Sequence, residues 1–121
     1  MASVIVVEDE PEIRTFLGDV LTQAGFATLN TATADAAAQL LRLHQDDIHL
    51  LVTDIDMPGA LDGVALAKVA RRQCPGMPVI FISGHPIRLR NAWTFTGPTA
   101  VFHKPFSFRM LVTAAQGFVQ P

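Results

Sequence analysis

The chain has 121 residues, 50% of them hydrophobic, and its 9 basic and 11 acidic side chains give a formal net charge of -2. This length and apolar content suit one hydrophobic core, so we predict a single domain over residues 1–121. The basic residues are scattered along the sequence and indicate no basic patch for direct nucleic-acid binding. The lone Cys74 excludes an internal disulfide framework and a paired-cysteine metal site.

Membrane and export signals are absent from the sequence. No apolar run approaches the roughly 20 residues that span a bilayer. The first residues also lack the basic-then-apolar order of a signal sequence. We therefore expect a soluble, cytoplasmic protein with no membrane partner.

Strand-like and helix-like patterns alternate along the chain. The clearest helical pattern has Pro11 at its start and Gly25 just past its end, with apolar residues every three or four positions between them. The predicted strands are residues 3–7, 27–31, 50–53, 78–82 and 100–103. Further helices are predicted at 34–44, at 63–73, in short or irregular form at 86–95, and after Ser107 as N-cap.

This alternation predicts an α/β fold. Right-handed crossovers between parallel strands place the helices on both faces of the sheet. We therefore predict a doubly wound (βα)5 sandwich of three layers around a parallel five-stranded sheet.

Polar side chains follow four of the five predicted strands. If the strand order is 2-1-3-4-5, the carboxylates after strands one and three converge on one crevice. Two like charges about 4 Å apart repel by about 4 kcal/mol at an effective dielectric constant near 20, which favours proton uptake or a bound cation. Mg²⁺, which prefers oxygen ligands and retains waters, suits this composition. The polar residues are Glu8, Asp9, Glu10, Asp54, Asp56, Ser83 and Lys104.

Four motifs in this order resemble the signature of the response-regulator receiver domains of bacterial two-component systems, including the chemotaxis receivers. They are Val-Val-Glu-Asp-Glu at 6–10, Asp54 with Met-Pro-Gly at 57–59, Ser-Gly at 83–84 and Lys-Pro-Phe at 104–106. The resemblance covers essentially the whole chain. It implies a flavodoxin-like fold with strand order 2-1-3-4-5.

The resemblance also implies a Mg²⁺ site. Asp9 and Asp54 would bind the ion directly, together with the backbone carbonyl of Asp56. Glu8 would act through a metal-bound water.

The phosphoacceptor implied by the resemblance is Asp54, which would take a phosphoryl group from a sensor histidine kinase or a histidine phosphotransfer protein. Lys104 would pair with Asp54 before transfer and with a phosphoryl oxygen afterwards, and Ser83 would hydrogen-bond another oxygen. Such transfer depends mainly on positioning and charge neutralisation. The Lys104–Pro105 peptide bond is expected to be cis, as is usual in the family.

The implied role is that of a signalling module, whose only catalysis is its own phosphorylation and autodephosphorylation. Its conformational change would reach a downstream protein through the face formed by the fourth helix, fifth strand and fifth helix. Homodimer formation stays open, as does whether the chain stands alone or is cut from a longer protein.

Three positions raise questions about signalling. Val101 stands where most receivers carry the aromatic residue that switches, and the adjacent Phe102 points to the opposite face of its strand. Either the signal travels through Ser83 and residues 86–95 instead, or Val101 and Phe102 are ordinary strand residues. In the family, the positions of Asp56 and His85 flank the path of the attacking water, which makes these residues either modulators of the phosphorylated state or ordinary polar surface residues.

Three alternatives are kept. Asp54-Ile55-Asp56 also resembles the nucleophile motif of haloacid dehalogenase-type phosphatases, which form an aspartyl phosphate with Mg²⁺. A flavodoxin-like flavin carrier is disfavoured because the acidic residues at 8–10 would repel the flavin phosphate. The third alternative is a receiver that signals without phosphorylation.

Overall fold

The computed structural model describes residues 2–57, 59, 61–85, 92 and 95–121. Its strands are β1 (Ser3–Val7), β2 (Ala27–Thr31), β3 (Ile48–Asp54), β4 (Val79–Ser83) and β5 (Thr99–His103). The helices in this part of the chain are α1 (Pro11–Gln23), α2 (Ala34–Leu43), α3 (Gly63–Gln73) and α5 (Phe108–Phe118). The irregular helix predicted at 86–95 falls mainly outside the described residues.

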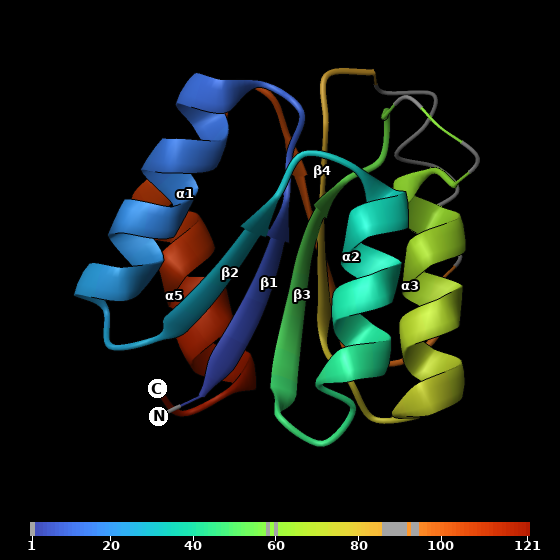
Figure 1. Ribbon diagram of the computed structural model, residues 1–121. Helices are drawn as coiled ribbons and strands as arrows, with labels where there is room; N and C mark the ends of the chain where they lie inside the picture. Colours follow the sequence, from blue (N-terminus) through green and yellow to red (C-terminus); the bar gives the residue numbers. More distant parts are fainter. Residues whose placement is uncertain (1, 58, 60, 86–91, 93–94) are drawn as a thin grey trace.

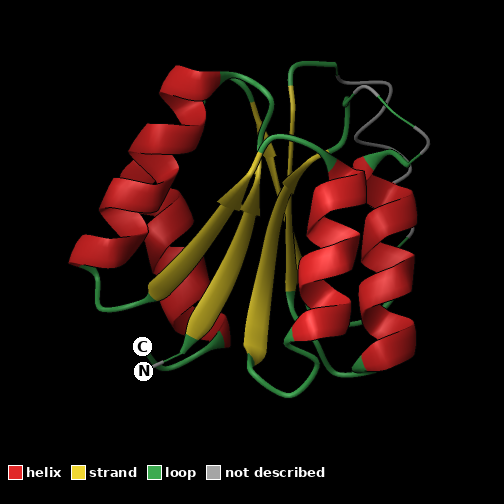
Figure 2. Cartoon of the chain, in the orientation of Figure 1, coloured by secondary structure: helices red, strands yellow, loops and turns green. Residues whose placement is uncertain are grey.

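All five strands are parallel and lie in the order β2-β1-β3-β4-β5. Helices α1 and α5 cover one face of the sheet, and α2 and α3 cover the other (Figure 1). Figure 2 shows the sheet between the two helical layers. The predicted doubly wound fold and strand order are therefore confirmed. None of the described helices is long and apolar enough to cross a membrane.

Alternating side chains of the central strands build the two halves of the core. In β1, Val4 and Val6 pack toward α1 and α5, whereas Ile5 and Val7 pack toward α2 and α3. All four side chains are fully buried. A strand covered on both faces is apolar at every position, which explains why β1 and β3 read as continuous hydrophobic runs.

Strand β3 differs from its predicted span because it begins at Ile48 and includes Asp54. Ile48 pairs with Ser3 across a register shift, and the Ser3 backbone N–H donates to His49 Nδ1 at 3.1 Å. At the other end, Asp54 pairs with Ile82 of β4. Asp54 is therefore held by the sheet itself and not by a loop.

The two adjacent residues of β5 face opposite sides of the sheet, as expected. Val101 packs with the cluster under α2 and α3, which includes Phe81. Phe102 packs toward α1 and α5, with its ring centroid 6.1 Å from that of Phe106. Phe102 therefore cannot fill the place of an aromatic residue at 101.

Candidate functional site

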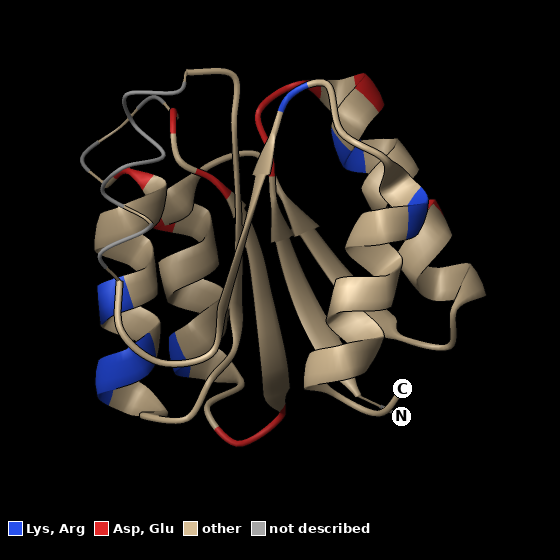
Figure 3. Ribbon diagram, turned by 180° about the vertical axis from the view of Figure 1, so that it is seen from behind, with Lys and Arg blue, Asp and Glu red and all other residues tan. Residues whose placement is uncertain are grey.

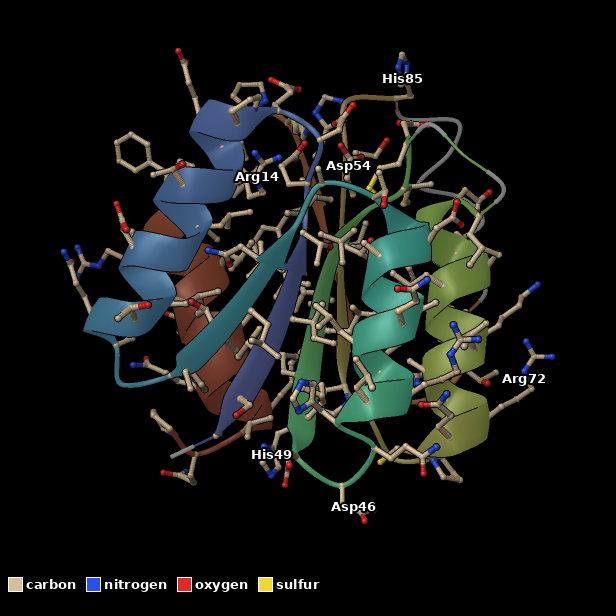
Figure 4. All side chains as sticks on the ribbon, viewed as in Figure 1. Arg14, Asp46, His49, Asp54, Arg72 and His85 are labelled. Carbon is tan, nitrogen blue, oxygen red and sulfur yellow. The ribbon has the colours of Figure 1, made fainter. Side chains whose placement is uncertain are left out.

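The polar residues that follow the strands meet at the carboxyl edge of the sheet. Asp54 and Ser83 are the last residues of β3 and β4 and are 3% and 0% exposed. The Ile55 N–H donates to the carbonyl of Ile82 at 2.9 Å, which continues the pairing past Asp54. Figure 4 shows Asp54 at this edge.

Three carboxylates form a compact cluster there. Glu8, Asp9 and Asp54 each offer an oxygen, and these oxygens lie within 4.8 Å of one another. Glu8 is fully buried, and its Oε2 accepts from the backbone N–H of Glu10 at 3.0 Å. Asp9 is exposed, so the cluster opens toward solvent on its side.

Lys104 is the counter-charge of this cluster. Its Nζ lies 2.8 Å from Glu8 Oε1, 2.9 Å from Asp54 Oδ2 and 3.2 Å from Glu10 Oε1. The Lys104 backbone N–H donates to the carbonyl of Ser83 at 2.8 Å, which anchors the residue after β5. The pairing with Asp54 that the resemblance implied is present, and the Lys104–Pro105 bond is cis.

Burial and neighbouring charges shift the pKa values of Glu8 and Lys104. Burial raises the pKa of Glu8 to about 7; the charge of Asp54 adds to the shift, while the Lys104 ammonium and the Glu10 N–H oppose it. For Lys104, burial alone would lower the pKa, but the bonds and charges of Glu8 and Asp54 outweigh it, so the pKa is raised. Lys104 therefore stays cationic beside the carboxylates.

The Ser83 hydroxyl forms hydrogen bonds to Asp56 and to the backbone of His85. Ser83 Oγ donates to Asp56 Oδ2 at 2.8 Å and accepts from the His85 backbone N–H at 3.0 Å. The Asp56 backbone N–H in turn donates to Asp54 Oδ1 at 3.0 Å. The His85 side chain is exposed and points away from Asp54 (Figure 4). In this state His85 contacts the site through its backbone only.

The sequence analysis did not predict the contacts of three residues that shape the site. Glu10 shares the Lys104 ammonium, and Arg14 Nη1 donates to the carbonyl of Glu8 at 3.0 Å. Gly63, the first residue of α3, lies so close to β3 that an added Cβ would be 2.1 Å from the Asp54 carbonyl oxygen. The acidic run at residues 8–10 could have indicated the contact between Glu10 and Lys104. The contacts of Arg14 and Gly63 arise only from tertiary packing.

The donor set fits a hard divalent cation. All its side-chain ligands are carboxylate oxygens, and one of them, Asp9, faces solvent, where waters can complete the coordination. Mg²⁺ typically takes one or two carboxylates and keeps several waters. The residues present therefore match this ion better than a nitrogen- or sulfur-preferring metal.

A doubly wound sheet with an acidic cluster and a lysine at its carboxyl edge defines a receiver-type α/β domain. The chain belongs to the response regulator receiver domain family, whose model matches residues 4–116. It is thus a signalling domain of two-component systems.

Individual relatives support this family assignment. The response regulator receiver protein CpdR of Brucella abortus is 34% identical over 113 residues, which cover 93% of this chain and 92% of CpdR. The nitrogen assimilation regulatory protein NtrX of Azorhizobium caulinodans is 30% identical over 115 residues, 93% of this chain but 25% of NtrX. A response regulator receiver protein from Sinorhizobium medicae has a TM-score of 0.88 at 30% identity, with 97% of this chain and 93% of that chain covered.

Proposed function

We propose that this receiver domain accepts a phosphoryl group on Asp54. The observation that carries the proposal is the position of Lys104 Nζ, 2.9 Å from Asp54 Oδ2 and 2.8 Å from Glu8 Oε1. A fixed cation beside the attacking carboxylate neutralises charge on the equatorial oxygens during transfer, which is the main demand of phosphoryl chemistry.

The donor in this proposal is a phosphohistidine of a sensor histidine kinase or a histidine phosphotransfer protein. A carboxylate oxygen of Asp54 attacks phosphorus, and the phosphorus–nitrogen bond breaks. Its electron pair stays on the imidazole nitrogen, which takes a proton from solvent. Lys104 then pairs with a phosphoryl oxygen, and the Ser83 hydroxyl leaves Asp56 to donate to another.

Mg²⁺ is the proposed cofactor. Asp9 and Asp54 would hold it through their side chains, Asp56 through its backbone carbonyl, and Glu8 through a water. When bound, the ion supplies positive charge to the phosphoryl oxygens. The cluster of Glu8, Asp9 and Asp54 oxygens within 4.8 Å supports this assignment.

The output proposed is a conformational change read by another protein in the cytoplasm. The face expected to carry it, helix 4 with β5 and α5, includes residues outside the described part of the chain. Membership of the receiver family removes the support for a haloacid dehalogenase-type phosphatase. We propose only slow autodephosphorylation, with Asp56 and His85 as modulators.

The deciding experiment treats the native protein and Asp54→Asn with acetyl phosphate, and separately with beryllofluoride, each with Mg²⁺ and with EDTA. With acetyl phosphate we expect one phosphoryl adduct by mass spectrometry, and with either reagent we expect amide shifts in the NMR spectrum, in each case only for the native protein with Mg²⁺. An identical response from Asp54→Asn would refute the assignment of Asp54. A native protein that takes up neither reagent would instead support signalling without phosphorylation.

A further inference from the structure

The charges of this chain are segregated along the sequence. Residues 1–56 hold ten of the eleven carboxylates and two basic side chains, a formal charge of -8. Residues 57–121 hold seven basic side chains and one carboxylate, Asp62, a formal charge of +6. The small net charge of -2 is therefore the sum of an acidic first half and a basic second half.

Three of the seven cations line one groove, away from the carboxyl edge of the sheet. The groove has a volume of about 490 Å³ and lies between α3 and the segment before β5. Figure 3 shows basic residues on α3, and in Figure 4 the Arg72 side chain points away from the protein. The lining residues are Lys68, Arg71, Arg72, Phe95 and Thr96.

Arg71 makes the floor of the groove rigid. Its Nε donates to the Met77 carbonyl at 3.0 Å, and its Nη2 donates to the Pro98 carbonyl at 2.5 Å and to Thr99 Oγ1 at 3.2 Å. The guanidinium carbon lies 4.5 Å from the centroid of the Phe95 ring. These bonds tie α3 to the start of β5 and leave the aromatic surface half-buried at the groove.

No carboxylate balances these cations within the described residues. The three ion pairs found there all involve Lys104. Asp62, the single acidic residue after position 56, accepts from the Ala65 N–H at 2.8 Å as the N-cap of α3. Lys68 and Arg72 are exposed, and burial lowers the pKa of Arg71. A partly buried guanidinium without a counter-charge is stabilised by an incoming carboxylate.

We propose that this groove docks an acidic segment of a partner protein. Lys68 and Arg72 are four residues apart on one helix face, which separates their backbones by about 6 Å along the axis. Two carboxylates at i and i+2 of an extended segment lie on one side of it at a similar spacing and would face α3. The apolar residue between them points to the opposite side and would face Phe95, in the segment before β5. Charge complementarity favours protein over nucleic acid, because the three cations of this groove would neutralise few phosphates of a nucleic-acid backbone, and the acidic residues 1–56 would repel such a polyanion.

The test is an NMR titration of the unphosphorylated protein at low salt. The probe is an acetylated, amidated pentapeptide with two glutamates on each side of a leucine. We expect shifts confined to amides of 68–72 and 95–99, and weaker binding as salt is raised. Because no phosphate is involved, the result is independent of the function proposed for Asp54.

Charge reversal provides the matched comparison. Lys68→Glu/Arg72→Glu is expected to weaken peptide binding by about tenfold or more, because two ion pairs become repulsive. Arg42→Glu/Arg109→Glu makes the same change in net charge at exposed sites elsewhere and is expected to bind like the native protein. Thermal unfolding of each variant checks that the fold is kept.

Three results would overturn the proposal. One is an equal loss of binding in both double variants, which would indicate a non-specific charge effect. Another is the absence of shifts at 68–72 and 95–99 with millimolar peptide. The third is tighter binding of an oligothymidylate than of the peptide at these residues, which would make the groove a nucleic-acid site.

Discussion

Ser83 Oγ donates to Asp56 Oδ2 at 2.8 Å, so the hydroxyl assigned to a phosphoryl oxygen is held by a carboxylate in the resting state. The His85 N–H fixes the same oxygen from the other side at 3.0 Å. The phosphorylation proposed for Asp54 would therefore require Ser83 to exchange one anionic acceptor for another. The Asp56 carboxylate that holds Ser83 would also bring a negative charge close to the incoming phosphoryl group.

Removal of the Asp56 side chain tests this exchange. We expect Asp56→Ala to speed phosphorylation by acetyl phosphate by about fivefold, equivalent to about 1 kcal/mol, because Ser83 is released and one negative charge is lost. Asp56→Asn keeps an acceptor for Ser83 and loses only the charge, so its rate is expected to lie between the rates of the native protein and Asp56→Ala. Stopped reactions analysed by mass spectrometry give the rates.

The same samples give the lifetime of the acyl phosphate after removal of the donor. Asp19→Ala, which removes an exposed carboxylate from α1, is the control and is expected to match the native protein. If neither Asp56 variant changes the rate of formation or of decay, Asp56 is not a modulator.

Lys104→Met removes the ammonium that Glu8, Glu10 and Asp54 share. Without metal, we expect the free energy of unfolding to fall by about 2–4 kcal/mol, because buried carboxylates lose their counter-charge. Mg²⁺ is expected to recover much of this loss and to bind more tightly than to the native protein, because Nζ no longer competes for the same oxygens. Urea unfolding with EDTA and with a series of Mg²⁺ concentrations measures both effects.

Lys68→Met is the control for this variant, since it removes an exposed lysine that makes no ion pair among the described residues. It is expected to change stability by less than about 0.5 kcal/mol. Weaker Mg²⁺ binding by Lys104→Met would contradict the idea that the lysine and the ion share ligands.

The raised pKa of Glu8 predicts how the metal-free protein responds to pH. The unfolded chain releases the Glu8 proton near pH 4.5, whereas the folded protein holds it until about pH 7. The resulting stabilisation is complete below the lower value and is lost as pH rises through the higher one. We expect up to about 3 kcal/mol of stability to be lost between about pH 5 and pH 8.

Urea unfolding in EDTA across this range measures the loss, and Glu8→Gln provides the comparison. The variant cannot ionise at this position, so its stability is expected to vary less with pH. Parallel curves for the native protein and Glu8→Gln would show that another group is responsible.

The fold was predictable because its signals are local. Continuous apolar runs indicated buried strands, and Pro11, Gly25 and Ser107 marked helix ends. The site was predictable in outline because parallel strands bring their carboxyl ends to one edge, which places the carboxylates after the neighbouring strands β1 and β3 together. The pairing of Lys104 with Asp54 was implied by the family resemblance, because β4 separates their strands.

Other contacts could not be predicted, since they depend on how distant segments approach. The bond from Ser83 to Asp56 depends on the rotamers of two side chains. The hydrogen bond from Arg71 to the Pro98 carbonyl joins residues 27 positions apart. Gly63 shows the same limit: its sequence context marks a helix start, but the need for glycine comes from the backbone of β3.

Gly63→Ala is the sharpest test of how the fold positions Asp54. An added Cβ would lie 2.1 Å from the Asp54 carbonyl oxygen and 2.8 Å from Ile55 Cα, so α3 or the end of β3 must move. We expect a loss of at least about 2 kcal/mol in the free energy of unfolding. Phosphorylation of the folded fraction is expected to slow as well, because Asp54 shifts relative to Lys104.

The matched control is Gly117→Ala in α5, where an added Cβ meets nothing within 4 Å. There alanine is expected to stabilise the protein by about 0.5–1 kcal/mol, because it restricts the unfolded chain and favours the helix. The two variants make the same chemical change with opposite expected signs. Equal stability of Gly63→Ala and the native protein would mean that α3 does not constrain the end of β3 that carries Asp54.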